Sequence, residues 1–492
     1  MKRPSRLGHF LEIMNGKIAT SCIVAILLLV HAGLLAYSAT RHSPTMNEPG
    51  HLVAGLSHWK FGRFEIYRVN PPLTHFVAAI PIMLAGYNED WSGFYDSPGA
   101  RPEFKMGEDF IKANGERSIW LFTIARWACI PFSLIGGLFC FFWSRELWGS
   151  NLAGLISLTL WCFEPNILAH GELITPDCAA SAFGLGACYL FWRWLKQPSW
   201  GRIVAAGGVL GLAELSKSSW IIFFGLFPLL WLFWLWTESY RKIRNQTPAA
   251  AVPSIARIPW LRSFSQLACL LLLGLYVLNL GYGFDGSFTQ LKEFEFVSHA
   301  LGGQKPGTPG NRFRGTWSGE IPMPVPKQYL RGIDLQKKDF EDYGQPSYLR
   351  GEWKDGGWWY YYIYGLAVKT PHGSQLMLVL SLLSVIYFFR INQHQPEAHH
   401  SGSRISTGMP PVRCRDLVVL WTVPVVLLIL VSSQLEFNHH VRYVLPVLGF
   451  AYVFAGINGW WFLPASPPDV PPVASMTCLA GLLPCEESAG PT

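Results

Sequence analysis

The amino-acid sequence predicts an all-α, polytopic integral membrane protein with about ten membrane-spanning helices. Of its 492 residues, 50% are hydrophobic and 14% are charged, whereas soluble domains carry about 25% charged residues. A helix that crosses a bilayer needs about 20 mostly apolar residues. Stretches of this kind lie at 19–38, 119–143, 151–169, 173–192, 203–218, 219–237, 264–283, 374–390, 417–433 and 441–459.

Basic residues indicate which side of the membrane each loop faces. The apolar run 73–87 is too short to cross, so we expect it to lie in the interface or to re-enter. The basic residues of the N-terminus and of every second loop after it then all fall on one side, which the positive-inside rule makes cytoplasmic. They are Lys2, Arg3, Arg6, Lys17, Arg145, Arg193, Lys196, Arg202, Arg241, Lys242, Arg244, Arg257, Arg262, Arg390, Arg404, Arg413 and Arg415. The opposite, extracytoplasmic side of the cell membrane receives an amphipathic first loop, 39–118, and a large loop, 284–373.

The chain reads as one membrane unit over residues 1–460, without an internal repeat or a separate soluble domain. Residues 461–492 are rich in proline and serine, a composition typical of disorder. The net charge of +7 is explained by cytoplasmic loops, so it does not indicate a nucleic-acid partner. We expect membrane lipids to surround the unit instead.

Polar residues gather beside the extracytoplasmic ends of the predicted spans. Ionisable groups at membrane depth are costly and usually mark a function. The candidates are Glu48, His51, His170, Glu172, Asp177, Lys217, Lys369, His439, His440 and Arg442. Carboxylates can take a proton from an acceptor hydroxyl, and lysine and arginine can stabilise a departing phosphate. The set therefore points to a transfer reaction that involves a phosphate.

Several of these residues also have structural interpretations. Asp177 opens a predicted helix, where it would serve as an N-terminal cap. Lys369 could equally extend to lipid headgroups, and His51 and His170 could be hydrogen-bonded structural histidines. Glu48 is harder to explain in this way, because the sequence suggests a Pro-Gly turn after it and no helix to cap. We expect desolvation at the membrane boundary to raise its proton affinity.

Five blocks of the sequence resemble one family when they are taken in order. They read "MNEPGHLVAGLSHWKFGRFEIYRVNPPL", "HGELITPD", "GGVLGLAELSKSSWIIF", "GEWKDGGWWYYYIYGLAVKTP" and "HHVRYVLP". They are similar to the GT-C membrane glycosyltransferases, above all to the dolichyl-phosphate-mannose protein mannosyltransferases and to the aminoarabinose and rhizobial lipopolysaccharide sugar transferases. The resemblance implies a GT-C-like fold.

The resemblance also implies a reaction. A polyprenyl-phosphate-linked sugar would be the donor and a hydroxyl of a protein or lipid-linked glycan the acceptor, with inversion at the anomeric carbon. Glu48 and Asp177 would be catalytic, and the other candidates would bind substrate. No cofactor is certain, although carboxylates could hold Mg²⁺ or Mn²⁺. The family pattern has Asp-Glu where this chain has Asn47-Glu48, so an inactive scaffold is one alternative; a transporter or flippase of lipid-linked glycans is another.

Overall fold

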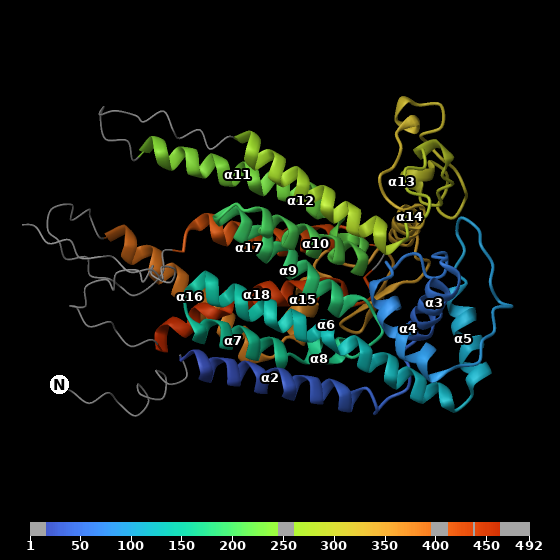
Figure 1. Ribbon diagram of the computed structural model, residues 1–492, viewed down its shortest axis with the longest axis horizontal. Helices are drawn as coiled ribbons and strands as arrows, with labels where there is room; N and C mark the ends of the chain where they lie inside the picture. The colour runs from blue at the N-terminus through green and yellow to red at the C-terminus, as the bar shows by residue number, and fades with distance from the viewer. Residues whose placement is uncertain (1–15, 245–259, 395–411, 436–437, 463–492) are drawn as a thin grey trace, which may run out of the picture.

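The computed structural model describes residues 16–244, 260–394, 412–435 and 438–462, as a bundle of roughly parallel helices with a layer of short elements at one end (Figure 1). The proline- and serine-rich tail, 461–492, lies almost wholly outside the described residues. Where the chain is described it is mainly helical, as the sequence predicted. The two strands, β1 (Ser347–Leu349) and β2 (Glu352–Lys354), form one short antiparallel hairpin.

Six described helices are long and apolar enough to cross a membrane, and a bent pair could form a seventh span. They are α2 (Lys17–Ser38), α6 (Arg117–Trp148), α11 (Phe223–Arg244) with the preceding turn η1 (Ser218–Ile222), α12 (Trp260–Gly281), α16 (His372–His394) and α17 (Cys414–Ser432). The bent pair is α7 (Asn151–Cys162) and α8 (Pro165–Gly171), whose axes differ by 62°. The protein is therefore an integral membrane protein, but ten spans are not confirmed.

The three other predicted spans hold helices of a different kind. These are α9 (Asp177–Lys196), α10 (Trp200–Ser216) and α18 (Pro446–Ala455), which is followed by η6 (Gly456–Phe462). Helix α10 has 17 residues and α18 has 10, so both are shorter than a bilayer requires. Most of α9 and all of α18 are buried, which identifies them as inner helices of the bundle.

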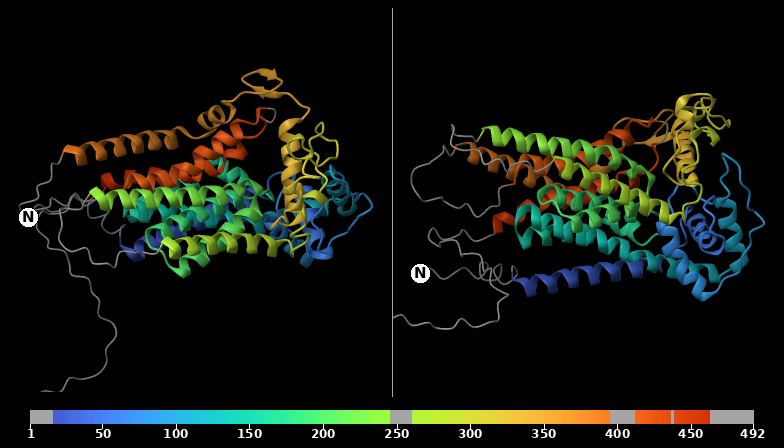
Figure 2. Two further views of the ribbon diagram at one scale, coloured as in Figure 1. Left: turned by 90° about the horizontal axis from the view of Figure 1, so that it is seen from above. Right: turned by 45° about the horizontal axis from the view of Figure 1, so that its top comes forward.

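The two predicted extracytoplasmic loops fold at the same end of the bundle (Figures 1 and 2). The first loop contributes α3 (Glu48–Phe61), α4 (Leu73–Ala85) and α5 (Glu103–Asn114). The large loop contributes η2 (Leu291–Glu293), α13 (His299–Gly302), η3 (Trp317–Glu320), α14 (Lys327–Glu341), the β-hairpin and α15 (Tyr361–Lys369). A turn, η5 (Val441–Val444), precedes α18 at this end. We call these elements the loop layer.

Candidate functional site

Three charged side chains meet where the bundle joins the loop layer. Lys217 Nζ donates a hydrogen bond of 2.8 Å to Asp177 Oδ1. Arg442 Nε lies 3.8 Å from Asp177 Oδ2. The Asp177 side chain is 4% exposed and that of Lys217 is 16% exposed. The aspartate is therefore buried between two cations.

The fold positions this cluster through helix ends. Asp177 is the first residue of α9, and Lys217 follows the last residue of α10 in an extended conformation. Asp177 does not cap its helix: the cap position is Pro176, and the carboxylate is turned to Lys217 instead. The interpretation of Asp177 as the cap residue was therefore wrong, although its charge does lie in the first turn of α9, where it complements the helix dipole.

Trp220 fixes the segment that carries Lys217. Its Nε1 donates to the Ala180 carbonyl on α9 at 3.0 Å, and its indole packs on Gly184, where an added Cβ would lie 2.0 Å from the ring. No larger residue fits at this position without a backbone shift. These contacts hold the segment that carries Lys217 against α9, so the lysine stays within reach of Asp177 at the start of that helix.

The first loop reaches the cluster through Asn47. With its amide oxygen facing Arg442, Asn47 accepts hydrogen bonds from Nη1 and Nη2 at 3.2 and 2.9 Å. Asn47 stands where the resembled family has aspartate. A neutral amide there can orient the arginine but cannot take a proton at neutral pH.

Glu48 turns away from Asn47 and pairs with Arg126 of α6. Glu48 Oε1 accepts from Arg126 Nε at 2.8 Å, and Oε2 accepts from Nη2 at 2.7 Å. Backbone N–H groups of Thr45 and Ile174 donate to the same carboxylate at 2.7 and 3.2 Å. The Glu48 side chain is 0% exposed and that of Arg126 is 1% exposed. Both carboxylate oxygens are therefore occupied.

Two expectations about Glu48 were wrong. The residues Pro49 and Gly50 do not form a turn; they lie in the first turn of α3, which begins at Glu48. Burial by itself raises the pKa of Glu48, but the hydrogen bonds and charge of Arg126, together with the Thr45 and Ile174 N–H groups, outweigh it and hold the pKa below its usual value. Desolvation does not make this carboxylate a stronger base.

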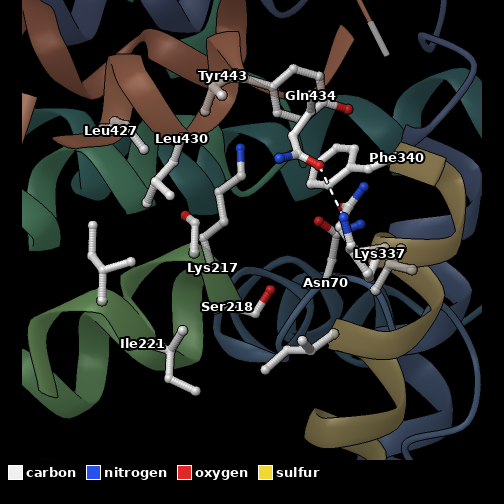
Figure 3. Close-up of a pocket in the computed structure, with 16 residues that line it drawn as sticks. Asn70, Lys217, Ser218, Ile221, Lys337, Phe340, Leu427, Leu430, Gln434 and Tyr443 are labelled. Carbon is white, nitrogen blue, oxygen red and sulfur yellow. Dashed lines mark hydrogen bonds between the residues drawn. The ribbon is translucent and has the colours of Figure 1, made fainter. Parts of the chain in front are cut away.

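An apolar cavity of about 280 Å³ opens on one side of the cluster (Figure 3). It lies between the α10–η1 junction, α14 and α17. Its polar lining includes Lys217, Lys337 and Gln434, and Lys337 Nζ donates to Gln434 Oε1 at 3.3 Å. Most of the remaining lining is aliphatic or aromatic, contributed by Val69, Ile221, Ile222, Ile333, Phe340, Leu427, Leu430, Val431 and Tyr443.

A second, more polar cavity of about 200 Å³ lies on the Arg442 side. Five of the sequence-predicted residues line it: His170, Lys369, His439, His440 and Arg442. Burial, with a smaller effect of the Arg442 charge, lowers the pKa of His440 to about 4. His440 is therefore neutral at physiological pH and offers hydrogen bonds without adding charge.

His51 and Glu172 complete the predicted set. His51 is buried and lies one turn of α3 after Asn47, which contacts Arg442, so it lies near the cluster. Glu172 lines neither cavity and is bonded to Ser38 and His42. Burial raises the pKa of Glu172, and the nearby His42 offsets part of that rise. Over the described ranges, no three His, Cys, Asp or Glu side chains are grouped to hold a metal ion.

Residues 121–261 match the family model described as "Dolichyl-phosphate-mannose-protein mannosyltransferase". The predicted resemblance to this family is confirmed. The matched segment contains both Asp177 and Lys217, as well as Arg126. A comparison with curated proteins gave no match.

Two solved structures are also similar. Both are of ArnT from Cupriavidus metallidurans, one bound to undecaprenyl phosphate and one in the apo state. They share 12% and 14% sequence identity with this chain, each with a TM-score of 0.42. Each match covers 88% of this chain and 59% of the other. The chain therefore spans about three fifths of the length of these two solved chains.

Sequence reasoning missed three residues that shape the site. Arg126 lies inside the apolar run 119–143, and an arginine at that depth was a usable signal for a buried partner. Lys337 lies in a polar, amphipathic helix, and only the packing of α14 over the cavity distinguishes it from other lysines. His75 lies in the short run 73–87 and is hydrogen-bonded to His51.

Proposed function

We propose that the protein transfers a sugar from a polyprenyl-phosphate carrier to a hydroxyl of a protein or lipid-linked glycan at the extracytoplasmic face of the membrane. The observation that carries the proposal is the position of Asp177. Its carboxylate, with Lys217 and Arg442, stands between an apolar cavity and a polar one. Such a junction suits a donor with a lipid half and a polar half.

The apolar cavity fits the lipid-phosphate part of the donor. Its aliphatic lining can cover isoprene units by ordinary hydrophobic burial, and at about 280 Å³ it holds the first units rather than a whole chain. Lys217 reaches it from the α10–η1 junction and Lys337 from α14 (Figure 3). Two ammonium groups over an apolar wall are a suitable site for a phosphate linked to a long hydrocarbon.

The polar cavity fits the sugar or the acceptor. His170, His439 and His440 offer neutral hydrogen-bonding groups. Arg442 lines this cavity and also lies beside Asp177. It can therefore contact the phosphate of a donor whose lipid part lies in the apolar cavity. The reacting bond would then lie close to the Asp177 carboxylate.

The reaction needs one bond to form and one to break. The acceptor oxygen attacks the anomeric carbon, the bond from that carbon to the phosphate oxygen breaks, and the phosphate keeps the electron pair. The Asp177 carboxylate receives the acceptor proton, and Lys217 and Arg442 stabilise the charge that develops on the leaving phosphate. Attack from the face opposite the phosphate inverts the anomeric carbon.

Asp177 is a better candidate for the base than Glu48. Both carboxylates are paired with cations, but the cations beside Asp177 line the two cavities, whereas Arg126, the partner of Glu48, lines neither. We therefore assign Glu48 to holding the start of α3, which sets Asn47 against Arg442. A transporter is less favoured, because the charged cluster lies at one end of the bundle rather than along a path through it (Figure 1).

Binding of a short-chain polyprenyl phosphate and of the polyprenol of equal length tests the donor site. The parent protein should bind the phosphate at least tenfold more tightly than the alcohol. Lys217→Ala should remove that difference, whereas Leu430→Trp, which fills the apolar cavity, should weaken both ligands. Equal affinity of the parent for phosphate and alcohol would contradict the proposed donor.

Mass spectrometry of envelope glycans and glycoproteins, with and without the protein, tests the reaction and finds the acceptor. We expect one component to lose a hexose or pentose in its absence, to regain it with the parent chain, and to remain unmodified with Asp177→Asn. Unchanged glycans, or restoration by Asp177→Asn, would contradict transfer at this site.

A further inference from the structure

Three buried histidines form a hydrogen-bonded chain that runs away from the charged cluster. His51 Nδ1 lies 2.8 Å from His75 Nε2, and His75 Nδ1 lies 3.2 Å from His58 Nε2. His58 Nδ1 ends the chain at the Arg63 carbonyl, 2.7 Å away. The three side chains are 2%, 0% and 6% exposed in the order His51, His75, His58.

The first loop is built to bring these rings together. His51 and His58 are seven residues apart on α3 and so lie on one face of the helix. Gly55 lies between them, and a Cβ there would lie 2.1 Å from the His75 carbonyl oxygen. Only glycine allows α3 and α4 to approach this closely.

The Arg63 carbonyl determines where each proton sits. A carbonyl only accepts, so His58 must carry its proton on Nδ1, which leaves Nε2 as an acceptor. His75 must then donate from Nδ1 and accept at Nε2, and His51 must donate from Nδ1. The remaining nitrogen of His51, Nε2, is left with a lone pair and no proton.

The free end of the chain lies near the charged cluster, because His51 follows Asn47 by one turn of α3, with its backbone N–H bonded to the Asn47 carbonyl, and the Asn47 amide contacts Arg442. The charges of Arg442, Asp177 and Lys217 act on His51, whereas Glu65 is the charge that acts on His58. Burial, followed by the Arg442 charge, lowers the pKa of His51 to about 3; burial lowers that of His58 to about 4. All three rings are therefore neutral near pH 7.

We propose that His51 Nε2 accepts a hydrogen bond from a hydroxyl of the bound sugar or acceptor, and that His75 and His58 are positioning residues that hold His51 in this tautomer. The identity of the substrate rests on the proposed function, whereas the position of the proton on His51 does not. A histidine free to take the other tautomer would present an N–H, which cannot accept from that hydroxyl.

Two variants of His75 separate polarity from packing. In His75→Gln, the side-chain amide can still accept from His51 and donate to His58. His75→Leu keeps much of the volume and does neither. The ¹⁵N spectrum of histidine-labelled protein, with the His51 signals assigned by their loss in His51→Gln, reports which nitrogen carries the proton. The kcat and KM for transfer from a synthetic polyprenyl-phosphate sugar form the second measurement.

We expect the parent and His75→Gln to show His51 protonated on Nδ1 alone, with similar kcat/KM values. His75→Leu should show protonation on Nε2 and a kcat/KM lower by about tenfold or more, the effect of losing one hydrogen bond to substrate. His51 protonated on Nε2 in the parent would overturn the proposal, as would a His75→Leu variant with unchanged tautomer and kcat/KM. A parent without transfer activity would refute the proposed function, and the spectra would still decide the tautomer.

Discussion

The guanidinium of Arg126 and the carboxylate of Glu48 make two parallel hydrogen bonds, of 2.8 and 2.7 Å, at a place that solvent does not reach. Arg126 also donates to the carbonyls of Ala39, His42 and Ser43. A single arginine of α6 thus fixes both the exit from α2 and the start of α3. The position of Asn47 beside Arg442 depends on this pair.

Glu48→Gln should therefore destabilise the protein. The substitution leaves a buried guanidinium without its counter-charge, which costs about 3–5 kcal/mol. The thermal unfolding midpoint in detergent measures the effect. The double variant Glu48→Gln/Arg126→Met should recover part of the loss, because no unpaired charge remains. A single variant as stable as the parent would show that the pair does not hold the loop.

Lys337→Ala should weaken donor binding. It removes a charge-assisted contact to the phosphate worth about 1.5–3 kcal/mol, so affinity for a short-chain polyprenyl phosphate should fall about tenfold or more. Lys338→Ala is the matched control, because the neighbouring lysine of α14 does not line the cavity. Equal losses in the two variants, measured by titration calorimetry, would indicate only a general effect of surface charge.

Stability should decrease as the pH falls from 7.5 to 5.5. His51 and His58 have folded-state pKa values of about 3 and 4, against about 6.5 when unfolded. The unfolded chain therefore binds more protons in this range, and each histidine contributes stability that is complete above pH 6.5 and is lost toward the lower pKa. The two together should cost about 2–3 kcal/mol.

The thermal midpoint at the two pH values measures this loss. Replacing both His51 and His58 by glutamine should reduce the dependence by their share, with that of His75 remaining, whereas replacing the exposed His299 should not change it. A parent protein with equal midpoints at pH 5.5 and 7.5 would contradict the neutral, buried histidine chain.

The loop layer should face away from the cytoplasm. The N-terminus and the short loops predicted at the opposite end of the bundle are rich in basic residues, which the positive-inside rule makes cytoplasmic. Cysteines introduced at Ser92 and at Trp317, which is 82% exposed, should react with an impermeant maleimide in intact cells, while the exposed native Cys414 at the far end should react only after lysis. The reverse pattern would invert the topology.

Much of the site could be predicted from the sequence because polar residues stand out in an apolar chain. Asp177, Lys217 and Arg442 each lie at the end of an apolar run, and the runs of a helical bundle end together. The partner of each residue could not be predicted in the same way. Glu48 and Asn47 are adjacent in sequence, yet one turns to Arg126 and the other to Arg442, because α3 begins between them.

The number of spans shows a similar limit. Mean apolarity predicted 203–218 and 441–459 as spans, but it does not report where a helix ends. Lys217 adopts an extended conformation that ends α10, and α18 gives way to a 3₁₀ turn at Gly456. All of α18 is buried by its neighbours, so this helix need not match the bilayer thickness.

Sugar transfer in proteoliposomes from a synthetic polyprenyl-phosphate sugar tests the central claim, that Asp177 is the base, most directly. Asp177→Asn should lower kcat by about 10²–10⁴-fold, the usual scale of a general base, with donor binding retained. Asp416→Asn, a buried aspartate of α17 bonded to Trp192, should turn over like the parent, and folded Glu48→Gln/Arg126→Met should keep most of its kcat. Near-parental turnover by Asp177→Asn, with loss of transfer in the Glu48 variant, would contradict this account and make Glu48 the base.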